Sequence, residues 1–157
     1  MRRRNVLKSI ASATASVGLI ATGSEPVAAR ALTETDRRAQ FIETRGGASL
    51  FYKDWGAGKP VVFIHSWALN ADMWQYQMIH LANQGLRCVA YDRRGHGRSG
   101  DPGRGYDYDT LSDDLAALLE RLNLREVTLV GHSMGGGEIV RYLTRHGSGR
   151  VSRGIAP

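Results

Sequence analysis

The chain has 157 residues, a length typical of one domain, and its 42% hydrophobic and 23% charged residues are those of a globular protein. The formal net charge of +6 raises the possibility of nucleic-acid binding, but residues 1–31 carry +4 of it and residues 32–157 only +2. Because the basic character belongs to the N-terminal tail, no nucleic-acid partner is expected. A single cysteine, Cys88, excludes an intrachain disulfide, and its apolar neighbours predict a small buried thiol.

Residues 1–31 have the parts of an export signal: a basic start, a mildly apolar run at Ile10–Ala21 and a cleavage motif at Ala29–Ala31, with Val27–Ala29 as a second option. The apolar run is too short to cross a bilayer as a helix, so no stable membrane span is expected. Arg3–Lys8 resembles the twin-arginine motif, which routes folded proteins across the membrane. We therefore expect a periplasmic or extracellular protein; the alternative is a basic, disordered tail.

The next stretch predicts three strands. Phe41–Glu43 begins a strand, Gly46-Gly47 indicates a two-residue hairpin turn, and Ser49–Trp55 alternates as a second strand. After a turn at Gly56–Pro60, the continuous apolar run Val61–Ile64 is typical of a central parallel strand.

Helices and strands then alternate. Asp72–Gln84 is predicted to form a helix that Gly85 closes, followed by a strand at Arg87–Tyr91 and a loop at Asp92–Gly105. Thr110 can cap the next helix. One face of the helix predicted at Asp72–Gln84 comprises Met73, Trp74, Gln77, Met78 and Leu81. The buried stripe of the second helix comprises Leu111, Leu115, Leu118, Leu119 and Leu122. This order predicts an α/β fold with a parallel sheet and right-handed crossovers.

The most informative stretch follows. Val127–Val130 reads as a buried strand, Gly131–Gly135 has the pattern G-x-S-x-G, and Glu138–Leu143 reads as a helix. Strand, tight turn and helix are the context of a nucleophile elbow. Such a bend raises the Ser133 hydroxyl above the sheet and directs the Met134 N–H, at the helix N-terminus, toward a developing oxyanion.

The glycines of this stretch have a steric explanation. A side chain at Gly131 or Gly135 would collide with the reversing backbone, and the residue at the apex is held in a strained conformation. Gly136 and Gly137 are poor helix formers, which makes sense if the helix lies close against the strand. The alternative is a glycine-rich turn with an incidental serine.

A second oxyanion donor must come from the end of the strand at Val61–Ile64. By position this is the Trp67 N–H, with the indole forming part of a pocket wall; the alternative is an ordinary strand-end turn. We expect His65 to fix the loop rather than to transfer protons, and we do not expect His96 to be the general base. No histidine pair has metal-ligand spacing, and the single cysteine argues against zinc, so no metal site is predicted.

Gly95–Gly100 matches G-x-G-x-x-G and follows a predicted strand. The dinucleotide fingerprint requires its glycines to open a helix directly. Here Asp92–Arg94 precedes them, and Pro102, Gly103 and Gly105 keep the chain irregular afterwards. No dinucleotide cofactor is predicted.

From Phe41 onward the chain resembles the α/β-hydrolase superfamily, and in particular its cofactor-free, non-haem chloroperoxidases and aryl esterases. The segments that together carry the resemblance are Val62–His65, Tyr91–Ser99, Gly105–Leu111, Asp113–Leu115 and Val130–Gly136. The resemblance implies that residues 32–157 form the N-terminal part of an α/β-hydrolase domain with a mostly parallel sheet. It also implies a serine hydrolase with Ser133 as nucleophile and the Met134 and Trp67 N–H groups as oxyanion donors.

The implied substrate is a small-molecule ester or acyl compound, without metal, haem or other cofactor. Hydrolysis of a carboxylic ester and formation of a peracid from hydrogen peroxide both stay open. A dehalogenase is not expected, because that chemistry places a carboxylate where this chain has Ser133.

Two departures from the family matter. Ser66 stands where the family usually has glycine, before the oxyanion residue. The superfamily's catalytic triad runs serine, acid, histidine along the chain, so its acid and base are expected beyond Pro157. We therefore expect a C-terminally truncated hydrolase, a fragment that lacks its triad Asp and His. The alternative is a non-catalytic or decayed binding protein of the same fold.

Overall fold

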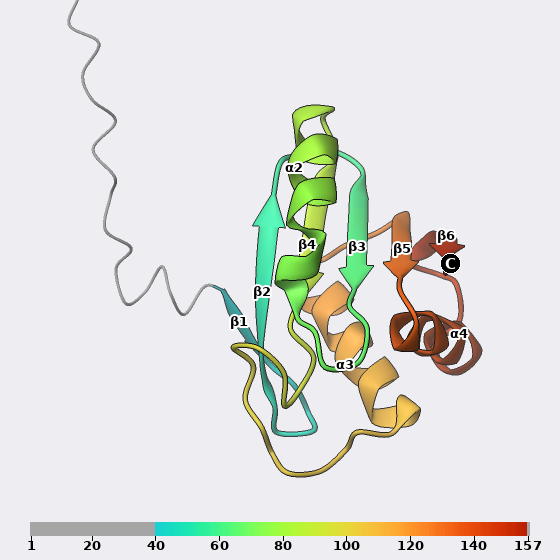
Figure 1. The fold of residues 1–157 in the computed structure, drawn as a ribbon. Helices are drawn as coiled ribbons and strands as arrows, with labels where there is room; N and C mark the ends of the chain where they lie inside the picture. Colours follow the sequence, from blue (N-terminus) through green and yellow to red (C-terminus); the bar gives the residue numbers. More distant parts are fainter. Residues whose placement is uncertain (1–39, 157) are drawn as a thin grey trace, which may run out of the picture. The chain divides into compact units, whose positions relative to one another are not determined.

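The computed structural model describes residues 40–156. The predicted export signal lies outside this range and stays a prediction. The described residues form one six-stranded sheet in the order β1-β2-β4-β3-β5-β6 (Figure 1). Its strands are β1 (Phe41–Glu43), β2 (Ser49–Trp55), β3 (Pro60–Ile64), β4 (Arg87–Tyr91), β5 (Val127–Gly131) and β6 (Val151–Ile155). The pairs β1–β2 and β2–β4 are antiparallel and the other three pairs are parallel, which confirms the mostly parallel sheet.

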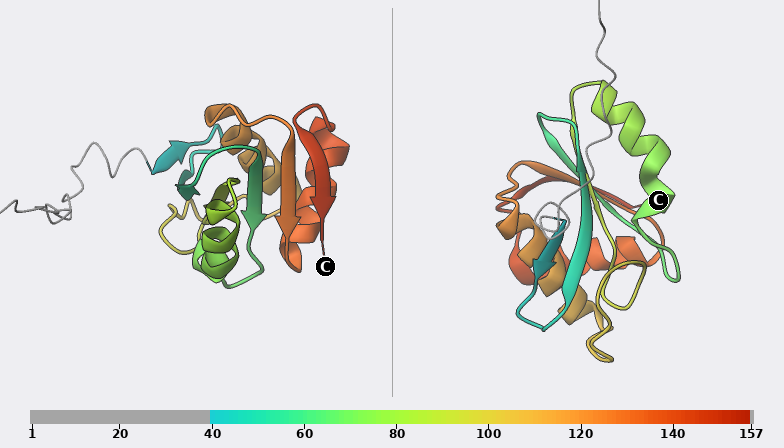
Figure 2. Two further views of the ribbon diagram at one scale, coloured as in Figure 1. Left: turned by 90° about the horizontal axis from the view of Figure 1, so that it is seen from above. Right: turned by 90° about the vertical axis from the view of Figure 1, so that its left-hand side faces the viewer.

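Helices cover both faces of the sheet (Figures 1 and 2). The short 3₁₀ helix η1 (Ala71–Trp74) and α2 (Gln75–Asn83) lie on one face, while α3 (Tyr108–Arg121) and α4 (Met134–His146) lie on the other. The larger core joins α3 and α4 to the sheet, and a smaller core joins η1 and α2 to its other face. No helix within residues 40–156 is long and apolar enough to cross a membrane.

The leucine stripe of α3 is confirmed, because Leu111, Leu115, Leu118 and Leu119 are fully buried. Its last member, Leu122, follows the helix and is partly buried against the same core. The predicted N-cap of α3, Thr110, is wrong by about one turn. Asp107 caps α3, and its carboxylate accepts a hydrogen bond from the Thr110 N–H (2.9 Å). A carboxylate suits this position because it faces the unpaired N–H groups of the first turn.

The helix predicted at Asp72–Gln84 begins as the 3₁₀ turn η1, capped by Asn70, and becomes α-helical only at Gln75. Trp74 and Met78 are buried as expected, but Gln77 is exposed. The 3₁₀ turn has three residues per turn, so it shifts the buried face relative to a uniform α-helix.

The turn between β1 and β2 also differs from the prediction. The Thr44 N–H donates to the Ala48 carbonyl oxygen (2.9 Å) and the Gly47 N–H donates to the Thr44 carbonyl oxygen (3.0 Å). These bonds close a three-residue loop instead of a two-residue one. Gly47 takes the left-handed conformation (φ +76°) that such a loop requires at its last position.

Strand β5 is interior to the sheet, with parallel neighbours β3 and β6. The register pairs Ile64 with Gly131, the last residues of β3 and β5. The segments that follow these two strands therefore leave the sheet side by side at its carboxyl edge, where ligands bind in open α/β sheets.

Candidate active site

Ser133 lies between the end of β5 and the start of α4, in the predicted strand–turn–helix context. Its backbone has φ 55° and ψ −114°, a region that residues other than glycine rarely occupy. The turn is held by the His132 N–H, which donates to the Ile64 carbonyl oxygen (3.2 Å), and by the Gly136 N–H, which donates to the Ser133 carbonyl oxygen (2.9 Å). Backbone strain of this kind, maintained by its surroundings, is characteristic of functional sites.

The two glycines that flank the turn are required by close backbone contacts. A Cβ atom at Gly131 would lie 2.5 Å from the carbonyl carbon of Gly135, and a Cβ atom at Gly135 would lie 2.6 Å from the carbonyl oxygen of Ile64. Both distances are shorter than real Cβ contacts. The predicted collision with the reversing backbone is confirmed for Gly131, whereas Gly135 would collide with the neighbouring strand β3.

Gly136 and Gly137 serve other neighbours than the strand before the turn. A Cβ atom at Gly136 would lie 3.0 Å from the Ala156 Cβ atom, just after β6, and one at Gly137 would lie 2.6 Å from the Tyr108 hydroxyl oxygen, at the start of α3. We expected these glycines to bring α4 close to the strand before the turn. That expectation is wrong, because the residues that they contact belong to other segments. They make room for segments on either side of α4.

Both predicted oxyanion donors lie at this carboxyl edge. Met134 is the first residue of α4, so its N–H has no acceptor within the helix. Trp67 follows β3 by three residues and is 59% exposed. Within residues 40–156, no backbone carbonyl group accepts a hydrogen bond from the Trp67 N–H. Neither N–H thus has a hydrogen-bond acceptor among the described residues, while the role of both groups in catalysis stays a prediction.

His65 has the structural position that was expected. Its ring is fully buried, the Nδ1–H donates to the Ser66 carbonyl oxygen (2.7 Å), and Nε2 accepts from the Arg93 N–H (2.9 Å). Burial, assisted by the positive charge of Arg93, lowers the pKa of His65 from 6.5 to about 4. A neutral, fully hydrogen-bonded imidazole fixes the loop and has no free site for proton transfer.

The stability of the chain is expected to depend on this neutral histidine. Between pH 6.5 and about 4 the unfolded chain binds a proton at His65 that the folded chain does not, so stability falls as the pH is lowered through this range. The full loss is about 3 kcal/mol at 1.36 kcal/mol per pKa unit. Urea unfolding at pH 7, 6, 5 and 4 measures it. The variant His65→Gln should have a flatter pH profile, and an equally steep profile would contradict the assignment.

His96 packs beside the same loop. Its ring lies 5.1 Å from the Trp67 ring and 5.3 Å from the His65 ring, between centroids, and its Nδ1 is 2.9 Å from the Arg94 carbonyl oxygen. No hydrogen bond between the residues that the structure describes joins His96 to Ser133. His96 therefore packs against the Trp67 loop. The expectation that it is not the general base stays a prediction.

A buried charged cluster that was not predicted from the sequence joins Tyr91, Arg93 and Glu138. The Arg93 Nε–H donates to Glu138 Oε2 (2.8 Å), and the Tyr91 hydroxyl donates to Glu138 Oε1. All three side chains are buried, and burial raises the pKa of the Glu138 carboxyl despite the nearby Arg93 charge. The sequence did contain one indication of this cluster. Glu138 lies on the same helical face as Ile139 and Tyr142, and a charge on a buried face needs a partner.

The glycine-rich segment after β4 forms an irregular loop, as predicted. The Asp92 carboxylate holds it, accepting from the Arg98 N–H (2.8 Å) and, outside the loop, from the Ala71 N–H (2.7 Å). The Gly95 N–H donates to the Gly100 carbonyl oxygen (3.0 Å). Between the end of β4 at Tyr91 and the start of α3 at Tyr108 there is no helix, so the glycines do not form the helix N-terminus that a dinucleotide site requires.

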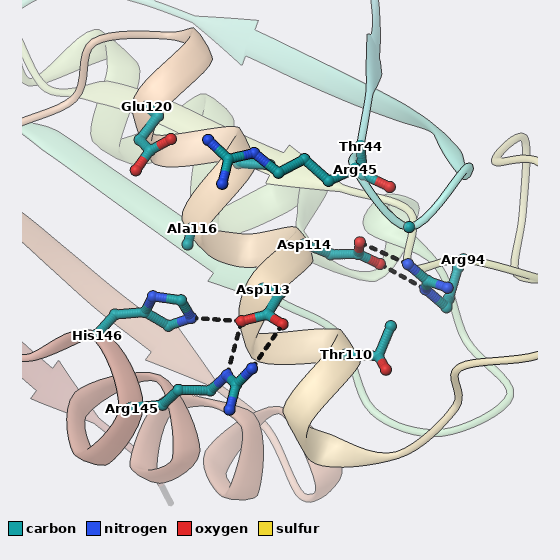
Figure 3. Close-up of a pocket in the computed structure, with 12 residues that line it drawn as sticks. Thr44, Arg45, Arg94, Thr110, Asp113, Asp114, Ala116, Glu120, Arg145 and His146 are labelled. Atoms are coloured by element: carbon teal, nitrogen blue, oxygen red, sulfur yellow. Dashed lines mark hydrogen bonds and ion pairs between the residues drawn. The ribbon is translucent and has the colours of Figure 1, made fainter.

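A polar groove of about 550 Å³ lies away from the elbow, between the β1–β2 turn, α3 and the end of α4 (Figure 3). Two of its arginines have carboxylate partners: Asp113 binds Arg145 and also contacts His146, and Asp114 binds Arg94. Ser133 does not line it. Within residues 40–156 no group of three His, Cys, Asp or Glu side chains has the arrangement of a metal site.

Comparison with known proteins agrees with this geometry. The sequence model of the family described as "alpha/beta hydrolase fold" matches residues 59–156. A non-heme chloroperoxidase from Kitasatospora aureofaciens is 57% identical over 112 residues, which are 71% of this chain and 41% of the relative. A bifunctional esterase/perhydrolase from Acinetobacter calcoaceticus is 43% identical over 117 residues, which are 73% of this chain and 42% of the relative.

A solved structure gives the same result. An esterase from Exiguobacterium antarcticum superposes with a TM-score of 0.73 at 41% sequence identity, over 74% of this chain and 44% of the esterase. The chain spans less than half the length of each of these three proteins. The matched family model covers more than half of the chain and includes both β3 and the elbow. The chain therefore belongs to the α/β-hydrolase family.

Proposed function

We propose that the chain supplies the nucleophile and the oxyanion hole of a serine hydrolase that acts on carboxylic esters. The observation that carries the proposal is the strained backbone of Ser133 at the N-terminus of α4, held by glycines that cannot be replaced without a backbone collision. A strained serine between a strand and a helix is the arrangement that presents a nucleophile in this fold.

In the proposed reaction the Ser133 oxygen attacks the acyl carbon and its proton passes to a general base. The carbonyl oxygen of the substrate becomes negatively charged, and the Met134 and Trp67 N–H groups donate hydrogen bonds to it. The partial positive charge at the N-terminus of α4 adds to this stabilisation. Collapse of the tetrahedral intermediate releases the alcohol and leaves an acyl group on Ser133.

Within residues 40–156 no histidine or carboxylate side chain is hydrogen-bonded to the Ser133 hydroxyl. The relatives are more than twice as long as the matched region. By resemblance, we propose that the base and the acid belong to the part of the fold that these relatives have beyond that region.

The acceptor of the acyl group can be water or hydrogen peroxide. Transfer to water gives a carboxylic acid, whereas transfer to hydrogen peroxide gives a peracid and restores the Ser133 hydroxyl. The names of the relatives, a chloroperoxidase and an esterase/perhydrolase, support including the second acceptor. A peracid oxidises halide ions, which is how a cofactor-free site can halogenate.

Labelling with a fluorophosphonate tests the nucleophile. We expect slow labelling, because no base is hydrogen-bonded to the Ser133 hydroxyl within residues 40–156, and mass spectrometry should find the label on Ser133. The variant Ser133→Ala should not be labelled, whereas the control Ser66→Ala, in the neighbouring loop, should be. Labelling that survives Ser133→Ala would refute the proposal. Absence of label on the unmodified chain would favour the non-catalytic alternative.

A further inference from the structure

Two consecutive arginines after β4, Arg93 and Arg94, are both about 1% exposed, and each binds a buried carboxylate. The partner of Arg93 is Glu138 in α4, and the partner of Arg94 is Asp114 in α3. The proposed reaction uses neither pair. Because burying a charge pair is costly unless geometry and further hydrogen bonds compensate, two such pairs in one short segment call for an explanation.

The contacts of Arg93 separate it from its neighbour. Its Nε–H donates to Glu138 Oε2 (2.8 Å), its Nη2–H donates to the His65 carbonyl oxygen (2.8 Å), and its backbone N–H donates to His65 Nε2 (2.9 Å). One residue thus binds both the helix that begins at Met134 and the loop that carries Trp67. Glu138 lies four residues, about one helical turn, after Met134.

Arg94 makes no contact of this kind. Its guanidinium binds Asp114 through two hydrogen bonds (2.6 and 2.7 Å) and the Arg104 carbonyl oxygen through a third (3.2 Å). All of these partners lie in α3 or in the loop before it. The Arg94–Asp114 pair therefore has similar chemistry and burial but does not touch the elbow or the Trp67 loop.

Given the proposed serine-hydrolase function, on which this step rests, we propose that Arg93 is a positioning residue for the oxyanion hole. Its guanidinium links the His65–Trp67 loop to α4 through Glu138, and so sets the spacing between the Trp67 and Met134 N–H groups. The Tyr91 hydroxyl holds the second oxygen of Glu138 and keeps its carboxylate turned toward Arg93.

The expected effect follows from where oxyanion donors act. They stabilise charge that develops in the transition state, so a change in their spacing should lower kcat and leave KM nearly unchanged. Loss of one donor typically costs about 10²–10³-fold in kcat. A displaced donor is a smaller change, and we expect about a tenfold loss or more.

The test compares matched pair variants of the full chain. Arg93→Met with Glu138→Gln removes the charge pair and keeps an acceptor for Tyr91. Arg94→Met with Asp114→Asn makes the corresponding change in the neighbouring pair. Amide NMR spectra report the Trp67 and Met134 N–H groups directly, without any need for activity. We expect both signals to shift or broaden in the Arg93 pair variant and to stay in place in the Arg94 pair variant.

Kinetics supply the second readout. Fluorophosphonate labelling of Ser133 should slow about tenfold or more in the Arg93 pair variant and less than about twofold in the Arg94 pair variant. Where turnover of p-nitrophenyl acetate is measurable, the loss should appear in kcat. If the Arg93 pair variant does not fold, Arg93→Lys replaces it. The guanidinium now binds Glu138 and the His65 carbonyl oxygen through two different nitrogens, and a single ammonium nitrogen cannot reproduce that geometry, so the Trp67 amide signal should still shift.

The outcomes separate the two proposals. Unchanged Trp67 and Met134 amide signals in the Arg93 pair variant, or equal changes in the Arg94 pair variant, would overturn the positioning role. Failure of the unmodified chain to label at Ser133 would overturn the proposed function instead. The amide signals would still decide whether Arg93 holds the loop against α4.

Discussion

Replacing Gly135 with alanine is expected to lower the free energy of unfolding by about 3 kcal/mol, or to prevent folding. The added Cβ atom would lie 2.6 Å from the carbonyl oxygen and 3.1 Å from the carbonyl carbon of Ile64, at the end of β3. These are backbone atoms of a strand hydrogen-bonded on both sides, so no flexible side chain can move away. Urea unfolding of the purified full chain measures the change.

The direction of the change in the free energy of unfolding is informative, because it is opposite to the change expected for an ordinary helix. Gly135 is the second residue of α4, and in an ordinary helix alanine is more stable than glycine by roughly 0.5–1 kcal/mol. Gly149→Ala is the control, because a Cβ atom there meets nothing within 4 Å, and its stability should change by less than about 0.5 kcal/mol. A stabilised Gly135→Ala variant would mean that α4 does not press against the end of β3, and the tight turn at Ser133 would lose its physical basis.

The fold was largely predictable because its signals are local. Continuous apolar runs marked β3 and β4, and a leucine at every third or fourth position marked α3, so each element could be identified without knowing its neighbours. The errors occurred where geometry depends on a short irregular turn. The exposed Gln77 follows from the 3₁₀ turn before α2, and the three-residue loop before β2 follows from a left-handed Gly47.

The elbow was predictable for a related reason. The strand, the turn and the helix that present Ser133 are consecutive in the chain, and the glycines are visible in the sequence as the small residues that a sharp bend requires. Only the contact with Ile64 comes from a distant part of the chain. Trp67 was predicted as a donor only from its position after β3, because no local motif marks it. The register that brings Ile64 beside Gly131 then places the two loops together.

The charged cluster could not be predicted from local sequence. Arg93 and Glu138 are 45 residues apart, and nothing in the run around Arg93 distinguishes it from Arg94. Which arginine faces α4 and which faces α3 depends on how these helices pack on the sheet. A charge that replaces an apolar residue on a buried helical face is the signal to seek, but its partner is determined only by the tertiary structure.

Replacing Arg94 alone with methionine is expected to lower the free energy of unfolding by about 3–5 kcal/mol. The substitution leaves the Asp114 carboxylate, 2% exposed, without the two guanidinium hydrogen bonds that now satisfy it. An isolated buried carboxylate is costly because the interior cannot replace its hydration. Adding Asp114→Asn should recover most of the loss, since the remaining amide is neutral.

The exposed ion pair of Arg141 with Asp109 is the matched control, because the same arginine-to-methionine change is made where water can solvate the abandoned carboxylate. Arg141→Met should leave the free energy of unfolding nearly unchanged. Urea unfolding of the three variants at pH 7 makes the comparison. If Arg94→Met were as stable as Arg141→Met, the Asp114 carboxylate would have to reach water in the folded chain, and α3 could not be closed against the segment after β4 as the structure requires.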